Sequence, residues 1–196
     1  MDYPEFNLDI PRIGYFVVYK GDNSFFCNQI RKVQRDLGFD QTDSDYTHIE
    51  VSGGGPWTVG ALFPKSKLIN IIKKYPGRYI KIMKYNGEDY DGRPSAKVGF
   101  FGSSRANLPY SFLGAIWHRL NSWLFPGINP FVSKKRPICS YLCAWALCKE
   151  YPDAFEEPKN VMPAHFLSNT KFTCVWQGYL PVAENEVEFN KVKIGK

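Results

Sequence analysis

The chain has 196 residues, of which 44% are hydrophobic, 16% aromatic and 22% charged, a composition that excludes an intrinsically disordered chain. This length predicts a single domain, residues 1–196, with a core large enough to fold without disulfides or metal ions. With only three histidines and five cysteines, histidine or thiol chemistry has few candidates.

Targeting signals are not evident. The chain opens Met-Asp-Tyr-Pro-Glu, without the basic and apolar regions of a secretory signal peptide. No uncharged run reaches about 18 residues, so we expect no transmembrane helix. An odd number of cysteines without framework spacing predicts free thiols. We therefore expect a cytoplasmic or particle-associated protein, with delivery by a non-classical route as the alternative.

The net charge of +6 is unevenly distributed. Residues 65–84 carry seven basic and no acidic side chains, whereas residues 1–64 carry five basic and nine acidic ones. Two interpretations stand: a solvated face, or a contact with an anionic partner such as lipid headgroups or wall polymers. Charge alone would support nucleic-acid binding, which we do not expect.

The first third of the chain predicts a strand, a helix and a loop. Residues 14–20 (GYFVVYK) are aromatic and β-branched, as is typical of a strand. A helix should follow, with Asn23 or Ser24 as its N-cap and Gly38 at its end. Apolar residues recur along it at helical spacing: Phe26, Ile30, Val33 and Leu37. Residues 39–45 predict a polar loop.

A hairpin and a further strand are expected next. Residues 46–51 (YTHIEV) alternate like a strand, residues 53–56 form a turn, and residues 57–63 give the partner strand. Residues 68–74 predict a short helix or turn. Residues 78–85 (RYIKIMKY) alternate clearly as a strand.

The second half predicts a helix within residues 110–124, a Pro-rich loop over 125–137 and a buried, largely apolar helix over 138–149. One or two strands should follow within residues 172–194. Because the early strands are joined by hairpins and not by βαβ crossovers, the pattern favours an α+β fold, with helices against a mostly antiparallel sheet.

Cys139 is the candidate nucleophile. Pro137 marks a helix start, which places Cys139 in the first turn of the buried helix. The free N–H groups and the dipole at a helix start stabilise a thiolate and can hold an oxyanion. The alternative is that Cys139 is a small buried core residue.

His48 is the best candidate base. It lies within YTHIEV, and the two-residue period of a strand puts Glu50 on the same face. A carboxylate beside a histidine fixes its tautomer and stabilises its charged form. A hydrogen-bonded strand histidine without catalytic role is the alternative. His118 and His165 have no such partner by spacing.

We expect no metal and no cofactor. Three of the cysteines share one helix, whereas zinc sites usually bring paired ligands from separate elements. The glycines at 53–55 lie between two strands and are not followed by the Lys-Ser/Thr of a phosphate-binding loop.

An ordered set of short motifs carries a family resemblance. The set comprises a Gly-Asp turn into a helix (YKGDNSFFCNQIRKV), a Thr-His strand (DYTHIEV), its hairpin partner ending in Ala (WTVGALF), a basic strand (GRYIKIMKY), a Pro-Tyr segment (NLPYSFLGA), the cysteine helix (PICSYLCAWALCKEY) and a Pro-containing loop (VMPAHFLSN). The chain thereby resembles the circularly permuted NlpC-type papain-like hydrolases, the YaeF/YiiX-like group, which is related to the lecithin–retinol acyltransferase-like proteins. The resemblance spans about residues 14–168 and leaves 169–196 as a C-terminal strand extension.

The resemblance implies a permuted papain-like fold, with Cys139 as nucleophile, His48 as base and Tyr110 lining the cleft. The permuted group usually has Glu just before the Ala of the hairpin partner strand, and this position is Gly60 here. The orienting residue is therefore open, with Glu50 or a backbone carbonyl as substitutes.

Three functions follow as hypotheses. The first is a cysteine amidase or peptidase that works through an acyl-enzyme, with peptidoglycan peptides as one substrate class. The second is an acyltransferase or lipase acting on lipid acyl groups. The third is a non-catalytic binding or structural protein of the same fold, which the Gly60 departure motivates.

Overall fold

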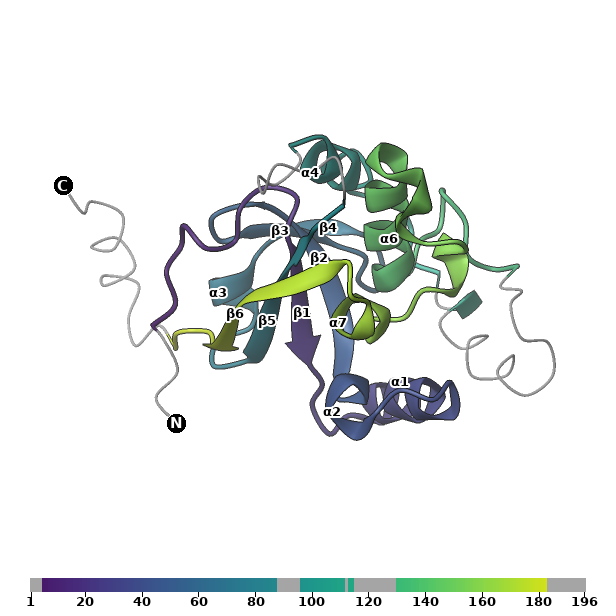
Figure 1. Ribbon diagram of the computed structural model, residues 1–196, viewed down its shortest axis with the longest axis horizontal. Helices are drawn as coiled ribbons and strands as arrows, with labels where there is room; N and C mark the ends of the chain where they lie inside the picture. Colours follow the sequence, from purple (N-terminus) through teal and green to yellow (C-terminus); the bar gives the residue numbers. More distant parts are fainter. Residues whose placement is uncertain (1–4, 88–95, 112, 115–129, 183–196) are drawn as a thin grey trace.

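A six-stranded sheet organises the protein in the computed structural model, which describes residues 5–87, 96–111, 113–114 and 130–182 (Figure 1). The strand order is β4-β3-β2-β1-β5-β6, and every neighbouring pair is antiparallel. The strands are β1 Phe16–Lys20, β2 Tyr46–Gly54, β3 Trp57–Gly60, β4 Lys67–Asn70, β5 Tyr79–Tyr85 and β6 Phe172–Tyr179. The predicted α+β class with an antiparallel sheet is confirmed.

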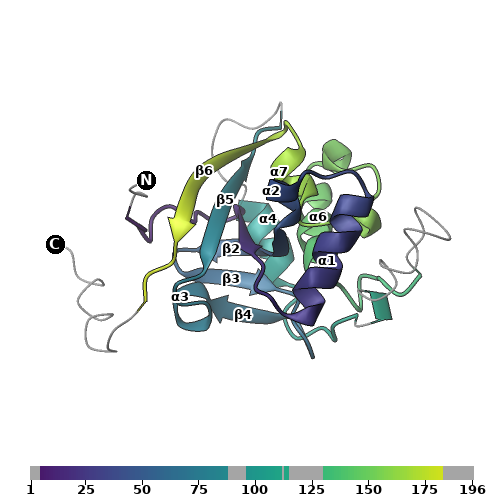
Figure 2. The same ribbon diagram turned by 90° about the horizontal axis from the view of Figure 1, so that it is seen from below.

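Helices cover both faces of the sheet (Figures 1 and 2). One face packs against the apolar residues of three helices and the segment between α6 and α7, and the other against α3 and the N-terminal segment. The helices are α1 Phe25–Asp36, α2 Gln41–Ser44, α3 Ile71–Lys74, α4 Ala96–Ser103, α6 Cys139–Glu150 and α7 His165–Ser168, with short 3₁₀ turns at Pro152–Ala154 and Pro158–Asn160. Alternation along the central strands therefore builds two cores, one on each face.

Local signals in the sequence set several of these boundaries. The Ser24 side chain accepts a hydrogen bond from the Cys27 N–H (3.3 Å) and caps α1, and Gly38 ends it with a φ of +88°. The turn between β2 and β3 holds Gly54 and Gly55 at positive φ, as the predicted hairpin requires.

Three expectations were wrong. Residues 39–45 are not all loop, because Asp40 accepts from the Asp43 N–H and caps the short helix α2. Residues 67–70 form β4, and α3 begins only after Asn70, which caps it. The partner strand β3 ends at Gly60 and not at residue 63.

Other expectations have a mixed outcome. Helix α4 was not predicted, whereas α6 confirms the predicted buried helix and β6 confirms one of the C-terminal strands. Because β6 pairs with β5, the C-terminal extension joins the main sheet. Of the helix predicted within 110–124, only residues 110–111 and 113–114 are described, and residues 125–129 of the following loop and residues 183–194 lie outside the described residues.

The basic segment 65–84 is divided in space. Lys65 and Lys67 lie before and on the edge strand β4, whereas Lys81 and Lys84 lie on β5. Three strands separate β4 from β5 in the sheet. The anionic-surface contact of this segment stays a prediction. Within the described ranges, no helix combines the length and the apolar character needed to cross a membrane.

Candidate active site

Helix α6 presents Cys139 at its first position. The N-cap residue, Ile138, is extended (φ −99°, ψ 170°) and its side chain makes no capping hydrogen bond. The first-turn N–H groups therefore have no side-chain cap, and the positive end of the helix dipole lies at the thiol. Residues 139–147 are all buried, so the core fixes the direction of this helix.

His48 projects from β2 beside a break in the sheet. On one side β2 pairs with β1, where Tyr19 lies opposite His48. On the other side β3 ends at Gly60, which follows the Val51–Val59 pair in register and thus faces Glu50. β3 thus ends before the position opposite His48, and the start of α6 brings the Cys139 side chain within hydrogen-bond distance of the ring.

Glu50 is fully buried and has four hydrogen-bond partners. Its Oε1 lies 2.9 Å from His48 Nε2 and accepts from the Tyr75 hydroxyl at 3.0 Å. Its Oε2 accepts from the hydroxyls of Tyr19 (2.7 Å) and Thr58 (2.5 Å). Burial opposes ionisation, yet these hydrogen bonds and the charge of His48 hold the pKa of Glu50 below its ordinary value. An ionised carboxylate only accepts, so Nε2 of His48 carries a proton and Nδ1 is left for Cys139.

Gly60 makes room for this carboxylate. A Cβ at position 60 would lie 2.6 Å from Glu50 Oε1 and 2.8 Å from its Cδ, closer than atoms approach. The space where a side chain of residue 60 would begin is therefore filled by Glu50. The glycine that departs from the family pattern and the carboxylate on the adjacent strand are complementary.

The charge of Cys139 couples to the ring of His48. Burial lowers the pKa of His48, but the negative charge of Cys139, their hydrogen bond and the Glu50 carboxylate together raise it from 6.5 to about 10. This direction favours the protonated, imidazolium form of His48, which its two neighbours stabilise.

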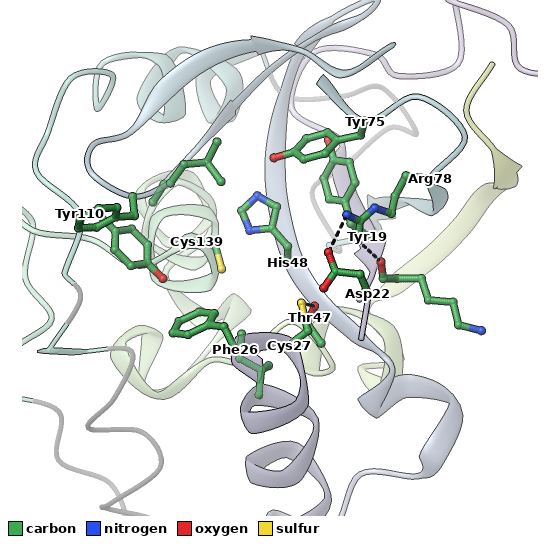
Figure 3. Close-up of a pocket in the computed structure, with 15 residues that line it drawn as sticks. Tyr19, Asp22, Phe26, Cys27, Thr47, His48, Tyr75, Arg78, Tyr110 and Cys139 are labelled. Atoms are coloured by element: carbon green, nitrogen blue, oxygen red, sulfur yellow. Dashed lines mark hydrogen bonds and ion pairs between the residues drawn. The ribbon is translucent and has the colours of Figure 1, made fainter. Parts of the chain in front are cut away.

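A pocket of about 380 Å³ opens over the pair (Figure 3). Figure 3 shows Cys139 and His48 at its centre, Tyr110 on one side and Tyr19, Tyr75 and Arg78 on the other. Its volume lies at the small end of the range of about 300–1,000 Å³ for small-molecule sites. The lining comprises Tyr19, Lys20, Asp22, Phe26, Cys27, Ile30, Thr47, His48, Ala61, Leu62, Phe63, Tyr75, Arg78, Tyr110 and Cys139.

Tyr110 lines the pocket near Cys139. Its backbone is held by a 2.8 Å hydrogen bond from its N–H to the Pro64 carbonyl. Burial and the charge of Cys139 raise the pKa of Tyr110, so its phenol stays protonated and is able to donate a hydrogen bond.

Two features of the pocket were not found from the sequence. Helix α1 contributes Phe26, Cys27 and Ile30, so two residues expected to repeat along a helix face line the pocket and not the core. Cys27 is a second thiol, which accepts a hydrogen bond from Thr47 at 3.1 Å. Among the described residues, no cluster of His, Cys, Asp or Glu is suited to a metal ion.

Gly60→Ala is expected to lower stability by about 1–3 kcal/mol and to lower activity, because the new methyl group displaces a carboxylate that four partners hold. Urea unfolding and steady-state kinetics measure the two effects. Gly53→Ala is the matched control, since its Cβ would find its nearest neighbour, the Trp57 carbonyl oxygen, at 3.6 Å. Equal effects of the two substitutions would show that Gly60 has no special relation to Glu50.

The raised pKa of His48 predicts a pH dependence of stability. Its folded pKa of about 10 lies above the unfolded 6.5, so its contribution is complete below pH 6.5 and is lost as the pH rises towards 10. The difference in unfolding free energy between wild type and His48→Gln should therefore shrink over this range. For His165, burial lowers the pKa, so His165→Gln should show no such decrease above pH 6.5. A constant difference for His48→Gln would contradict the pairing.

In comparisons with known proteins, no protein-family model and no curated protein matches the chain. The geometry described above is therefore the main guide to function.

Proposed function

We propose that this protein is a cysteine hydrolase that cleaves amide or ester bonds through an acyl-enzyme. The observation that carries the proposal is the arrangement of three groups: Cys139 at the uncapped start of α6, His48 beside it, and the buried Glu50 on the far nitrogen of the ring. A nucleophile, a base and an orienting carboxylate in this order are the parts that nucleophilic catalysis needs.

The reaction follows from these positions. The Cys139 proton passes to Nδ1 of His48, and the thiolate attacks the carbonyl carbon of the substrate. The oxyanion that forms accepts from the first-turn N–H groups of α6 and from the Tyr110 hydroxyl. The bond to the leaving group breaks as His48 returns the proton to it. Water then attacks the thioester, its proton goes to His48, and the acid and the free thiol are released.

The fold proposal goes with this function. We propose that the sheet and α6 correspond to a circularly permuted papain-like fold, in which the base strand β2 precedes the nucleophile helix. The motif order supports this, because His48 comes before Cys139 in the chain. Glu50 would then take the orienting role that the family pattern gives to the position of Gly60.

A second candidate is acyl transfer or lipolysis with the same residues. The apolar part of the pocket lining favours it, because Phe26, Ile30, Leu62 and Phe63 suit an aliphatic chain better than a charged peptide. The chemistry up to the acyl-enzyme is the same, and only the acceptor, water or another hydroxyl or amine, differs.

Trapping the acyl-enzyme tests the proposal. Wild-type protein mixed with an activated acyl ester and quenched in acid should gain one acyl group, which peptide mapping should place on Cys139. Cys27→Ala, which removes the other pocket thiol, should be acylated as wild type is. Acylation of Cys27 instead, or of neither thiol, would contradict the proposal, and the latter outcome would favour the non-catalytic hypothesis.

A further inference from the structure

The pocket has two chemically different parts on the two sides of the reactive pair (Figure 3). Beyond His48, Figure 3 shows Arg78 and Asp22 joined by an ion pair, whose shortest distance is 3.2 Å. Around Cys139, the lining is aromatic and aliphatic and includes Phe26 and Tyr110. A substrate that fills the pocket therefore meets charge at one end and apolar surface at the other.

The charged part has an excess of cations. Asp22 is already engaged, since it accepts from the Ser24 N–H and pairs with Arg78. Lys20 lines the pocket and lies 3.8 Å from Asp45, but that carboxylate also pairs with two arginines of α1, at 3.3 and 3.8 Å. Of the residues that line this end of the pocket, Lys20 and Arg78 are cationic and Asp22 is anionic, so it favours an anionic group.

The catalytic geometry orients the substrate in this pocket. His48 gives its proton to the leaving group, so the leaving group must lie on the His48 side, towards Arg78 and Lys20. The carbonyl oxygen points to the start of α6 and to Tyr110. The acyl chain is then left with the apolar wall that Phe26, Ile30 and Phe63 contribute.

We propose that the substrate is an ester, thioester or amide of an aliphatic acyl chain with an anionic leaving group. Lys20 and Arg78 bind the anion, and Phe26 on α1 is the wall against which the chain packs. This inference rests on the proposed function for the direction of the substrate, but its two binding contacts are testable without turnover.

Kinetics with matched thioesters test the assignment. Three S-octanoyl thioesters differ in the charge of the leaving thiol: mercaptopropionate is anionic, N-acetylcysteamine neutral and thiocholine cationic. The rate of enzymatic hydrolysis of each ester is divided by the rate at which the same ester reacts with a free thiol in solution, which corrects for its intrinsic reactivity. We expect the anionic ester to exceed the neutral one in kcat/KM by about fivefold at low salt, the effect of a partly exposed ion pair, and the cationic one to be slowest. Lys20→Gln should reduce this preference, since only Arg78 then contacts the anion, whereas Lys32→Gln should keep it, because Lys32 is an exposed lysine of α1 that does not line the pocket.

The acyl side has its own matched pair of variants. Phe26→Ala should lower kcat/KM for the octanoyl ester about tenfold relative to the acetyl ester, because contact between the ring and the chain is lost. Phe25→Ala is the control, since its side chain is 75% exposed and does not line the pocket. Equal effects of the two variants, or equal rates for the two esters, would overturn the acyl-side assignment.

A binding measurement separates this inference from the proposed function. In Cys139→Ala, calorimetry should show that the stable thioether octylthio-propionate binds more tightly than its uncharged amide. Adding Lys20→Gln to this variant should reduce the difference. Equal binding of the acid and the amide would overturn the inference even if Cys139 proves to be the nucleophile. Preferential binding of the acid without any acyl-enzyme in wild type would overturn the hydrolase and leave only the assignment of the anion contact standing.

Discussion

Replacing Cys139 with alanine should lower kcat/KM by about 10⁴-fold or more, because the substitution removes the proposed nucleophile of the acyl-enzyme. The loss should occur without unfolding. Cys139 is 7% exposed and begins a helix whose next eight residues are buried, so the packing of α6 does not depend on its sulfur atom. The thermal melting temperature should stay close to that of wild type, and steady-state kinetics should record the loss.

Cys27→Ala is the control for this loss. Cys27 lines the same pocket and is hydrogen-bonded to Thr47, so its removal tests whether any pocket thiol can act as nucleophile. We expect Cys27→Ala to keep most of the activity, since Cys27 is hydrogen-bonded to Thr47 and Asp22, whereas it is Cys139 that is hydrogen-bonded to His48. Full activity in Cys139→Ala, with loss in Cys27→Ala, would transfer the nucleophile to α1.

The location of the candidate pair, Cys139 and His48, could be predicted because its signals are local. A proline two residues before Cys139 predicts the helix start, and alternation in YTHIEV places His48 and Glu50 on one face. Cys139 and His48 line one pocket, although they are 91 positions apart in the chain. The two-residue spacing predicts the contact between His48 and Glu50. The pairing of His48 with Cys139 was predicted from the order of motifs in the resemblance.

The surroundings of Glu50 could not be predicted, because they depend on strand register. Tyr19 reaches the carboxylate from β1, Thr58 from β3 and Tyr75 from the end of α3, and no sequence spacing links these three residues. For the same reason, the sequence alone suggests that the orienting carboxylate is missing, because Gly60 stands where the permuted group usually has Glu. Only the register of β2 and β3 shows that Glu50 lies against it.

Helix α1 shows why an apolar stripe is ambiguous. Phe26, Ile30, Val33 and Leu37 repeat at helical spacing, which usually marks the face that packs on the core. In the structure only Val33 of these is buried, Leu37 is exposed, and Phe26 and Ile30 line the pocket. Helical periodicity identifies an apolar face, but the same periodicity is found where that face packs on a core and where it lines a pocket.

Glu50→Ala should lower the free energy of unfolding by about 3–5 kcal/mol, because a buried ion pair loses one partner and three hydroxyls lose their acceptor. Activity should fall by about 10²–10⁴-fold in the fraction that stays folded, since His48 loses the group that fixes its tautomer. Urea unfolding and kinetics below the unfolding transition measure the two losses. Glu150→Gln, which breaks a surface pair with Lys97, should change stability by less than about 1 kcal/mol.

A pH profile separates the orienting role of Glu50 from a merely structural one. The carboxylate raises the pKa of His48, so in Glu50→Gln the upper limb of the kcat/KM profile should move to lower pH. The double variant Glu50→Ala with Gly60→Glu returns a carboxylate to the space between β2 and β3 and should recover part of the activity that Glu50→Ala loses. Such recovery would show that the requirement is for a carboxylate at this point beside His48, whichever of the two strands supplies it. An unmoved profile together with no recovery would leave Glu50 with a role in stability alone.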